Sequence, residues 1–310
     1  MNFTAIKKIQ MENSISKEKV YFNAEGVKLC GNLYKPANFD DTKQYPSIIT
    51  QGSAFSIKEQ MSGGYARKMA ENGFVALAFD YRTYGESEGQ PRQYENPEIK
   101  RNDLEAAVTF LISLPYVNKV NALGVCASGG NVAHLAATDD RLNAIAIVAG
   151  MVGGPSELGE ARGSNEEEMN ALIQFIQQAK QDYEQTGEAK TATGYSSTDK
   201  NAFYYNEVDY YENEKRGNIK EFKNEYAIIS LEPLFQFDPM SKAENINIPA
   251  IVFHSDNCVL PNASKNFYSK LKGEKELVWG TETQFNYYDK PELVNDVTTK
   301  ATEFFKKYLN

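Results

Sequence analysis

Short apolar runs and amphipathic stretches alternate in a regular order over the first 150 residues. Strands are predicted over residues 19–23, 27–34, 45–50, 74–79 and 144–148, the first two joined as a hairpin. Apolar residues recur at helical spacing over 61–72 and 98–114. Strands that alternate with helices predict an α/β fold with a mostly parallel sheet covered by helices on both faces.

The alternation stops in the middle of the chain. Residues 151–245 are polar and rich in Tyr and Glu, with one helical stretch over 166–185 and a loop rich in small polar residues over 186–199. Strands and helices resume over 249–254, 263–271, 276–279 and 294–308. We therefore predict a core of residues 19–150 and 246–310, an inserted lid or cap over 151–245, and an N-terminal extension over 1–18.

Composition and charge narrow the possible partners. The 310 residues carry a formal net charge of −9, which disfavours nucleic acid and anionic membranes as partners. The longest apolar run, 144–152, is too short to span a bilayer, and the first 20 residues contain no apolar segment typical of a signal peptide. Three widely separated cysteines indicate reduced thiols and a cytoplasmic protein. The sequence has no cluster of metal ligands, so we expect neither a metal nor another cofactor.

The strongest candidate for chemistry lies within residues 120–132. An apolar run ends at Gly124, a thiol follows at Cys126, and small residues occupy 128–130. A strand that turns sharply into a helix strains the backbone of the residue at the turn and leaves no room for bulky neighbours. The pattern predicts a nucleophile elbow at Cys126, and we expect the helix N-terminus to lower the pKa of that thiol. Ser128 is the alternative nucleophile, although its position in the helix would point its hydroxyl away from the cleft.

With the elbow placed, the chain resembles the α/β-hydrolase superfamily over residues 19–308. The stretches Lys-Glu-Gln at 58–60 and Phe-Asp-Tyr-Arg-Thr-Tyr-Gly-Glu-Ser at 79–87, with the elbow at 124–130, are similar to a bacterial dienelactone-hydrolase-like branch. Dienelactone hydrolases also have cysteine at the elbow. The resemblance implies the α/β-hydrolase fold and a carboxylic ester hydrolase with a cysteine nucleophile.

The resemblance also implies an oxyanion hole formed by two main-chain N–H groups. One belongs to Ala127, directly after the elbow. The other belongs to Ser53 or Ala54 in the loop over 51–55, where the family often has His-Gly. A plain loop between a strand and a helix would also contain glycine there, so both interpretations stay open.

The acid of a catalytic triad is expected in the loop after the strand that follows the lid. Alignment on Pro261 puts Asn257 at the usual acid position and Asp256 one residue before it. Asp256 serves as the acid if the loop shifts slightly. It is otherwise an ordinary turn residue in solvent.

The base is where the sequence departs from the family. Family members often have His before a Tyr-Asp pair, and this chain has Gln284 in that register. Glutamine cannot accept a proton near neutral pH, so an ordinary Cys-His-Asp triad cannot form at this position.

Two histidines and two carboxylates are the remaining candidate bases. His254 ends the strand before the acid loop, two strands from the elbow and therefore roughly 10 Å across the sheet. His134 lies eight residues beyond Cys126 on the elbow helix and favours a structural role. Glu59 and Glu282 are weaker candidates and favour surface positions.

Two functions from different classes follow. In the first, the protein hydrolyses a small carboxylic ester, lactone or thioester: Cys126 attacks the carbonyl, and His254 or Asp256 assists water in releasing the acyl group. A thiol tolerates a missing base better than a hydroxyl does, because a few per cent of an ordinary thiol is ionised at pH 7. In the second, a catalytically impaired pseudo-hydrolase binds a small hydrophobic ligand or a partner. The lid tyrosines favour an aromatic pocket or a homodimer contact, and they are Tyr204, Tyr205, Tyr210 and Tyr211.

Overall fold

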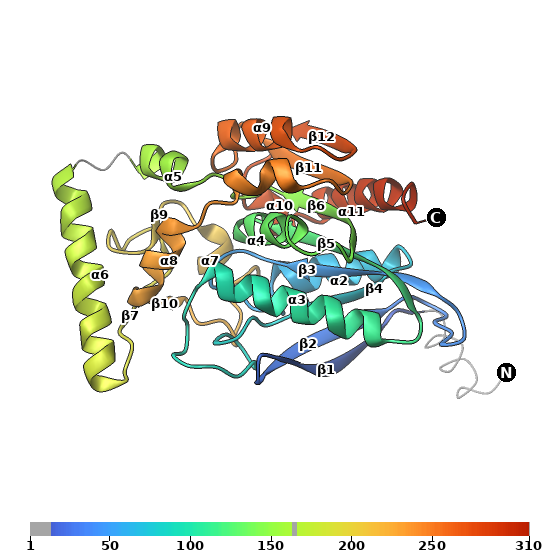
Figure 1. Ribbon diagram of the computed structural model, residues 1–310, viewed down its shortest axis with the longest axis horizontal. Helices are drawn as coiled ribbons and strands as arrows, with labels where there is room; N and C mark the ends of the chain where they lie inside the picture. The colour runs from blue at the N-terminus through green and yellow to red at the C-terminus, as the bar shows by residue number, and fades with distance from the viewer. Residues whose placement is uncertain (1–13, 163–165, 310) are drawn as a thin grey trace.

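The computed structural model describes residues 14–162 and 166–309 and contains a central eight-stranded sheet (Figure 1). In spatial order its strands are β1 (Ser16–Ala24), β2 (Val27–Lys35), β4 (Val75–Phe79), β3 (Tyr45–Gln51), β5 (Val117–Val125), β6 (Leu142–Val148), β11 (Ala250–Ser255) and β12 (Lys275–Gly280). β2 pairs antiparallel with both β1 and β4, and the other neighbours pair parallel. The predicted mostly parallel sheet is confirmed.

The antiparallel edge begins with the predicted hairpin. Glu25 and Gly26 have φ angles of 52° and 86°, the left-handed geometry of a tight two-residue turn between twisted strands. β1 begins at Ser16 rather than at residue 19. Of the N-terminal extension predicted over 1–18, residues 1–13 lie outside the described part of the chain.

Helices cover both faces of the sheet. α2 (Met61–Glu71) and α11 (Pro291–Lys306) pack together on one face, and α3 (Pro97–Ser113) and α4 (Ala127–Ala136) pack together on the other (Figure 1). α9 (Pro261–Lys270) lies against β11, and the single-turn helix α10 (Asn286–Asp289) precedes α11. The apolar stripe predicted on α3 is buried there at Leu104, Val108 and Leu111.

Residues 151–245, which we call the cap, leave the sheet after β6 and return to it at β11. Its helices are α5 (Pro155–Arg162), α6 (Glu166–Thr186), α7 (Asp209–Glu212) and α8 (Leu231–Gln236), with 3-10 turns over Ile228–Ser230 and Met240–Asn245. Two small sheets pair β7 (Thr191–Thr193) with β10 (Glu225–Ala227) and β8 (Tyr195–Ser196) with β9 (Tyr204–Tyr205). The cap elements gather at one end of the sheet, with α6 at the outer edge (Figure 1).

The loop predicted over 186–199 contains strands β7 and β8 instead. Their hydrogen-bond partners lie elsewhere in the cap, at β10 and β9. Pairing with a distant segment of the chain leaves little trace in local residue patterns, so these strands could not be predicted from their own residues. Within the described ranges, no helix is both long and apolar enough to cross a membrane.

Candidate functional site

The turn between β5 and α4 has the geometry of a strand-to-helix elbow. Cys126 is the N-cap of α4, with φ 56° and ψ −123°. A non-glycine residue adopts a positive φ only where the surrounding structure holds it, and here the Cys126 N–H donates to the carbonyl of Val148 at 3.0 Å. A β-carbon on Gly124 would lie 2.1 Å from the Ser128 carbonyl oxygen, which explains the small residue before the turn.

The Cys126 sulfur is almost enclosed. The residue is 7% exposed, and burial raises the pKa of its thiol to about 11 because the thiolate loses its solvation by water. Hydrogen bonds from the Tyr288 hydroxyl, the Ala127 main-chain N–H and the Gln284 side chain lower this pKa but do not offset burial. The expectation that the helix N-terminus leaves the thiol with a lowered pKa is therefore wrong, because desolvation outweighs the favourable dipole.

Gln284 lies beside the sulfur, at the place where the family's histidine was expected. Its Oε1 accepts the Val259 N–H at 3.1 Å, and its Nε2 donates to the Ala149 carbonyl at 2.9 Å and to the Tyr288 hydroxyl at 3.3 Å. A carbonyl on one side and an N–H on the other fix which end of the amide is which. The nitrogen therefore faces Tyr288 and the sulfur, so this group donates hydrogen bonds where a base would accept a proton.

His254 has its partners away from the Cys126 sulfur. It lies next to the last residue of β11, with β6 between β11 and β5, as expected from the strand order. Its Nδ1 donates to the Ser255 carbonyl at 2.9 Å, its ring stacks on Trp279 at 5.2 Å, and its buried Nε2 has no partner among the described residues. The structure does not bring together the predicted pair of Cys126 and His254.

The two candidate acids also face away from the sulfur. Asp256 is exposed and pairs with Lys265 at 2.7 Å and with Trp279 Nε1 at 3.2 Å. Asn257 is exposed and donates from Nδ2 to the Thr281 carbonyl at 2.7 Å. Both side chains stabilise the turn after β11, which is the structural role that turn residues of this kind favour.

The weaker candidates have partners elsewhere. His134 lies 3.6 Å from Glu98, which supports the structural role predicted for it. Glu59 pairs with the buried Lys58 at 2.9 Å, and Glu282 pairs with Lys290 at 2.7 Å.

Ser128, the alternative nucleophile, is buried in the first turn of α4. Its hydroxyl lies 3.4 Å from the hydroxyl of Tyr81, and its N–H donates to the Gly52 carbonyl at 3.2 Å. The Tyr81 contact agrees with a hydroxyl that points away from the cleft.

The predicted oxyanion loop lies directly against the elbow, because the hydrogen bond from Ser128 joins the two segments. Among the described residues, no oxygen accepts a hydrogen bond from the main-chain N–H of Ser53, Ala54 or Ala127. The next N–H, that of Phe55, donates instead to the buried Glu95 carboxylate at 3.1 Å. The two unpaired amides of this loop, with the Ala127 amide at the elbow, are donors of the kind that an oxyanion hole requires.

Two cap tyrosines cover this loop. The Tyr211 hydroxyl donates to Ser53 Oγ at 2.6 Å, and the Tyr195 hydroxyl donates to the Ala54 carbonyl at 2.8 Å. The two rings stack with centroids 3.6 Å apart. The Cys126 sulfur therefore lies under an aromatic cluster that includes Tyr288, whose ring packs edge-on against Tyr211.

Sequence reasoning found part of this cluster. Of the four lid tyrosines, Tyr210 and Tyr211 are buried, Tyr204 is half-buried, and Tyr205 is 48% exposed. Tyr195 and Tyr288 were missed. Tyr288 belongs to the Tyr-Asp pair used to place Gln284 in register, so the sequence contained a signal for it.

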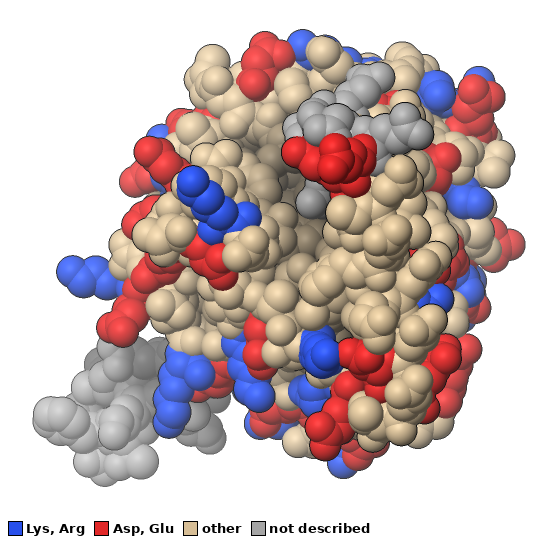
Figure 2. All heavy atoms as spheres, turned by 90° about the vertical axis from the view of Figure 1, so that its left-hand side faces the viewer, with Lys and Arg blue, Asp and Glu red and all other residues tan. Residues whose placement is uncertain are grey.

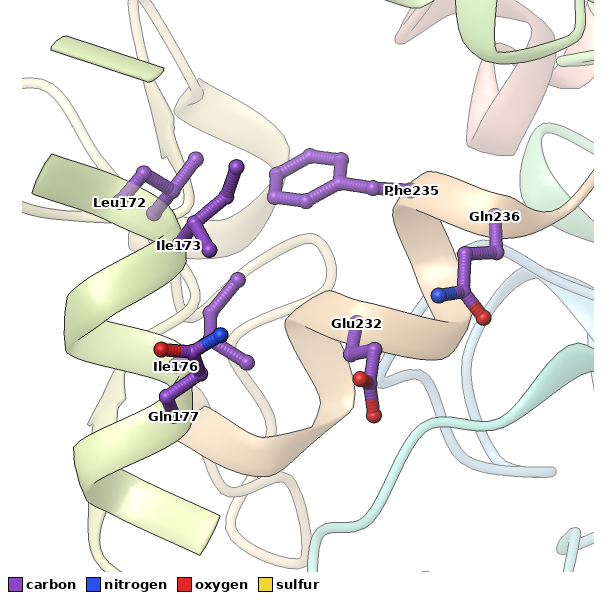
Figure 3. A pocket seen from close by; sticks show the side chains of 7 residues that line it. All are labelled: Leu172, Ile173, Ile176, Gln177, Glu232, Phe235 and Gln236. Atoms are coloured by element: carbon purple, nitrogen blue, oxygen red, sulfur yellow. The ribbon is translucent and has the colours of Figure 1, made fainter. Parts of the chain in front are cut away.

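A separate apolar groove of about 350 Å³ lies between α6 and α8. Leu172, Ile173 and Ile176 of α6 face Phe235 of α8 across it, and polar residues complete its lining (Figure 3). Viewed from this end, the molecule has a hollow lined mainly by uncharged side chains, with acidic and basic ones around it (Figure 2). None of the groove's lining residues hydrogen bonds to Cys126 or to the oxyanion loop, so the groove is distinct from the site around the sulfur.

Comparison with known proteins adds a family and several relatives. The family described as serine aminopeptidase, S33 matches residues 60–282, which is more than half of the chain. The chain is 41% identical over 129 residues to the uncharacterized protein YcjY of Escherichia coli K12, a match that covers 41% of this chain and 42% of that protein.

Two further relatives match a similar share. PA2218 of Pseudomonas aeruginosa is 40% identical over 142 residues, covering 45% of this chain and 38% of that protein. Its crystal structure has a TM-score of 0.85 at 26% identity, covering 96% of this chain and 95% of that chain. Thiohydrolase aneE of Aspergillus aculeatus is 32% identical over 143 residues, covering 46% of this chain and 43% of that protein. The aligned regions span about two-fifths of the length of these curated relatives.

Proposed function

Because the chain belongs to the serine aminopeptidase S33 family of α/β hydrolases, we propose that it hydrolyses a small carboxylic ester, lactone or thioester through an acyl intermediate on Cys126. In this proposal Ala127 and the loop at Ser53 and Ala54 supply the N–H groups of the oxyanion hole. The site is dienelactone-hydrolase-like in having cysteine at the elbow.

The observation that carries the proposal is the strained elbow at Cys126 beside free main-chain amides. A left-handed backbone at a non-glycine residue is unfavourable by about 1–3 kcal/mol, and such strain clusters at functional sites. The N–H groups of Ser53 and Ala54 have no acceptor within the described chain, although both residues are buried, and the N–H of Ala127 faces the Cys126 sulfur. A carbonyl oxygen of a ligand satisfies such donors, and more strongly when it becomes an oxyanion.

A thioester suits this site best among the three substrate classes. The Cys126 sulfur forms a bond to the carbonyl carbon, the bond from that carbon to the leaving sulfur breaks, and the thiol proton ends on the leaving sulfur. Water then attacks the new thioester, which releases the acid and restores the thiol. A thiolate is a better leaving group than an alkoxide because a thiol is the stronger acid, so a thioester needs less help from a catalytic acid than an ester does. The relative that is named a thiohydrolase supports this choice.

One observation favours the second candidate function, ligand binding without turnover. With a thiol pKa of about 11, roughly one sulfur in ten thousand is ionised at pH 7. Gln284 and the outward-facing Asp256 supply neither base nor acid. A pseudo-hydrolase would retain the carbonyl-binding amides and use them to bind a small hydrophobic ligand or a partner.

We also propose that the protein acts on a small molecule in the cytoplasm and can form a homodimer. Its three cysteines, Cys30, Cys126 and Cys258, are all unpaired and buried, which suits a reducing compartment. Tyr205, exposed on the cap, is a residue type that is enriched in protein interfaces.

The test combines turnover with detection of the acyl intermediate. A panel of acyl esters, lactones and acyl thioesters is incubated with the wild type, with Cys126→Ala and with the matched control Cys30→Ala. The mass of each intact protein is then measured by mass spectrometry. We expect an acyl adduct that maps to Cys126, and turnover that falls by roughly a thousand-fold or more in Cys126→Ala. Cys30 lies on β2, so Cys30→Ala should keep the wild-type rate.

Two outcomes would contradict the proposal. Equal turnover by the wild type and Cys126→Ala would exclude the cysteine nucleophile. The absence of both adduct and turnover over the whole panel, together with saturable binding of one of its members, would establish the pseudo-hydrolase.

A further inference from the structure

The Tyr288 hydroxyl lies beside Gln284 and the Cys126 sulfur, and neither the sequence motifs nor the family pattern assigns it a role. It lies in α10, is 3% exposed, and packs edge-on against Tyr210 at 5.1 Å and Phe285 at 5.4 Å. Its hydroxyl oxygen accepts the Gln284 Nε2–H at 3.3 Å and lies beside the Cys126 sulfur, where it would stabilise a thiolate. The ring cannot swing away from the sulfur without breaking this packing.

Val259, Gln284 and Tyr288 form a hydrogen-bond chain that leads to the sulfur. The Val259 N–H donates to Gln284 Oε1, Gln284 Nε2 donates to the Tyr288 oxygen, and that oxygen lies beside Cys126. The amide is fixed at both ends by main-chain groups, so the direction of the chain is fixed as well. Gln284 therefore holds the hydroxyl in place and takes no proton itself.

Burial makes ionic intermediates costly at this site. It raises the pKa of Cys126 and places the pKa of Tyr288 well above the usual tyrosine value. The titratable groups that face the sulfur include Cys258 of the acid loop and, from the cap, Tyr195, Tyr204 and Tyr211. None of these is a positive charge that would stabilise a thiolate, so a route that forms no free ion is favoured.

We propose that Tyr288 is a catalytic residue that relays the thiol proton to the leaving group. The inference rests on the acyl chemistry proposed above. As Cys126 Sγ bonds to the carbonyl carbon, the Sγ–H proton passes to the Tyr288 oxygen and the hydroxyl's own proton passes to the leaving sulfur or oxygen. The bond between that atom and the carbonyl carbon breaks, and Tyr288 is neutral before and after the step. In this relay Gln284 is a positioning residue, which holds the tyrosine oxygen so that one lone pair faces the thiol.

The test compares Tyr288→Phe with Tyr287→Phe. The first removes the relaying hydroxyl and keeps the ring that packs against Tyr210 and Phe285. The second removes a hydroxyl that donates to the His254 carbonyl at 3.3 Å, away from the sulfur. At pH 7 we expect Tyr288→Phe to lower kcat by about 10²- to 10⁴-fold with KM little changed, and Tyr287→Phe to keep the wild-type rate.

The dependence of rate on pH separates a relay from a packing role. Without the hydroxyl, hydroxide must first remove the thiol proton, so kcat of Tyr288→Phe should rise about tenfold per pH unit between pH 7 and 9. The wild-type rate should rise less steeply. Parallel pH profiles for the two proteins would overturn the relay, whatever the absolute loss.

A measurement on the wild type alone covers the case in which Tyr288→Phe does not fold. Two protons move together in the proposed step, so the rate in mixtures of H₂O and D₂O should curve with deuterium content. A straight line would overturn the relay. Loss of Cys126 dependence, or no wild-type turnover, overturns the proposed function and the relay together. A Cys126-dependent rate that Tyr288→Phe leaves unchanged overturns the relay alone.

Discussion

The site at Cys126 and the groove between α6 and α8 lie in the same molecule and differ in almost every physical respect. The sulfur lies under stacked tyrosines, with main-chain amides and a side-chain amide around it. The groove is open, lined by aliphatic side chains and Phe235, and belongs to the cap alone. This open groove is therefore not where the candidate chemistry lies.

The difference shows which region depends on exact geometry. At the sulfur, polar groups are buried and paired one by one, and a buried polar group that loses its partner costs about 1–3 kcal/mol. In the groove, apolar groups meet solvent, and their contacts are neither directional nor complete. Substitutions should therefore change the free energy of unfolding strongly at the sulfur and weakly in the groove.

The largest effect is expected from Gly124→Ala. Its added β-carbon would overlap the Ser128 carbonyl oxygen, and neither of these main-chain segments can move without breaking the elbow. We expect a loss of about 3 kcal/mol or more in the free energy of unfolding, measured by urea denaturation.

Gly64→Ala on α2 is the matched control, because a β-carbon there meets nothing within 4 Å. That variant should be unchanged or more stable by up to about 1 kcal/mol. Equal stability of the two variants would mean that the elbow is not tightly packed.

A smaller effect is expected from pH, through His254 beneath the loop that holds Gln284. Burial lowers the pKa of His254 and outweighs the opposing effects of the Ser255 and Val259 backbone and of Asp256, while Lys265 lowers it further. The unfolded chain then binds the proton first, so stability falls as the pH drops through about 6.5, by at most about 1.4 kcal/mol per pH unit.

The variant His254→Asn should reduce this fall when the free energy of unfolding is compared between pH 7 and pH 5. His134 remains in both proteins and accounts for part of any residual slope, because burial also lowers its pKa. An identical pH dependence in the variant and the wild type would show that His254 titrates normally in the folded protein.

The smallest effect is expected in the groove, from Ile173→Gln. Ile173 is 45% exposed, so the free energy of unfolding should change by less than about 0.5 kcal/mol. Fluorescence of an apolar naphthalene dye should decrease because the groove loses apolar surface. Ile112→Gln on α3 is the control, since Ile112 is similarly exposed outside the groove. A loss above about 1 kcal/mol for Ile173→Gln alone would mean that the groove is closed in solution.

The strands and helices of the core could be predicted because each carries its own local pattern. The strand at Tyr45–Gln51, the helix at Pro97–Ser113 and the elbow at Cys126 depend on apolar spacing and on small residues near in sequence. The strand order follows from the βαβ rule, which placed His254 two strands from Cys126.

The surroundings of the sulfur could not be predicted in the same way. The sequence indicates where a thiol lies along the chain, but its pKa depends on burial and on Gln284 and Tyr288, more than 150 positions away. The cap residues Tyr195 and Tyr211 also lie close to it. The hydroxyl contacts of these residues with the 53–54 loop bridge about 140 to 160 positions. Local sequence patterns do not show which distant ring covers an atom. For that reason the predicted lowering of the Cys126 thiol pKa was wrong.

The hydroxyls of Tyr211 and Tyr195, which join the cap to the 53–54 loop, also bear on how fast a ligand can reach the Cys126 sulfur. If a ligand reaches the sulfur, which is 7% exposed, through this side of the cap, Tyr211 must first release Ser53 and Tyr195 must release Ala54. The waiting time before each encounter is then a property of the protein, and adding more ligand cannot shorten it below the interval between spontaneous openings.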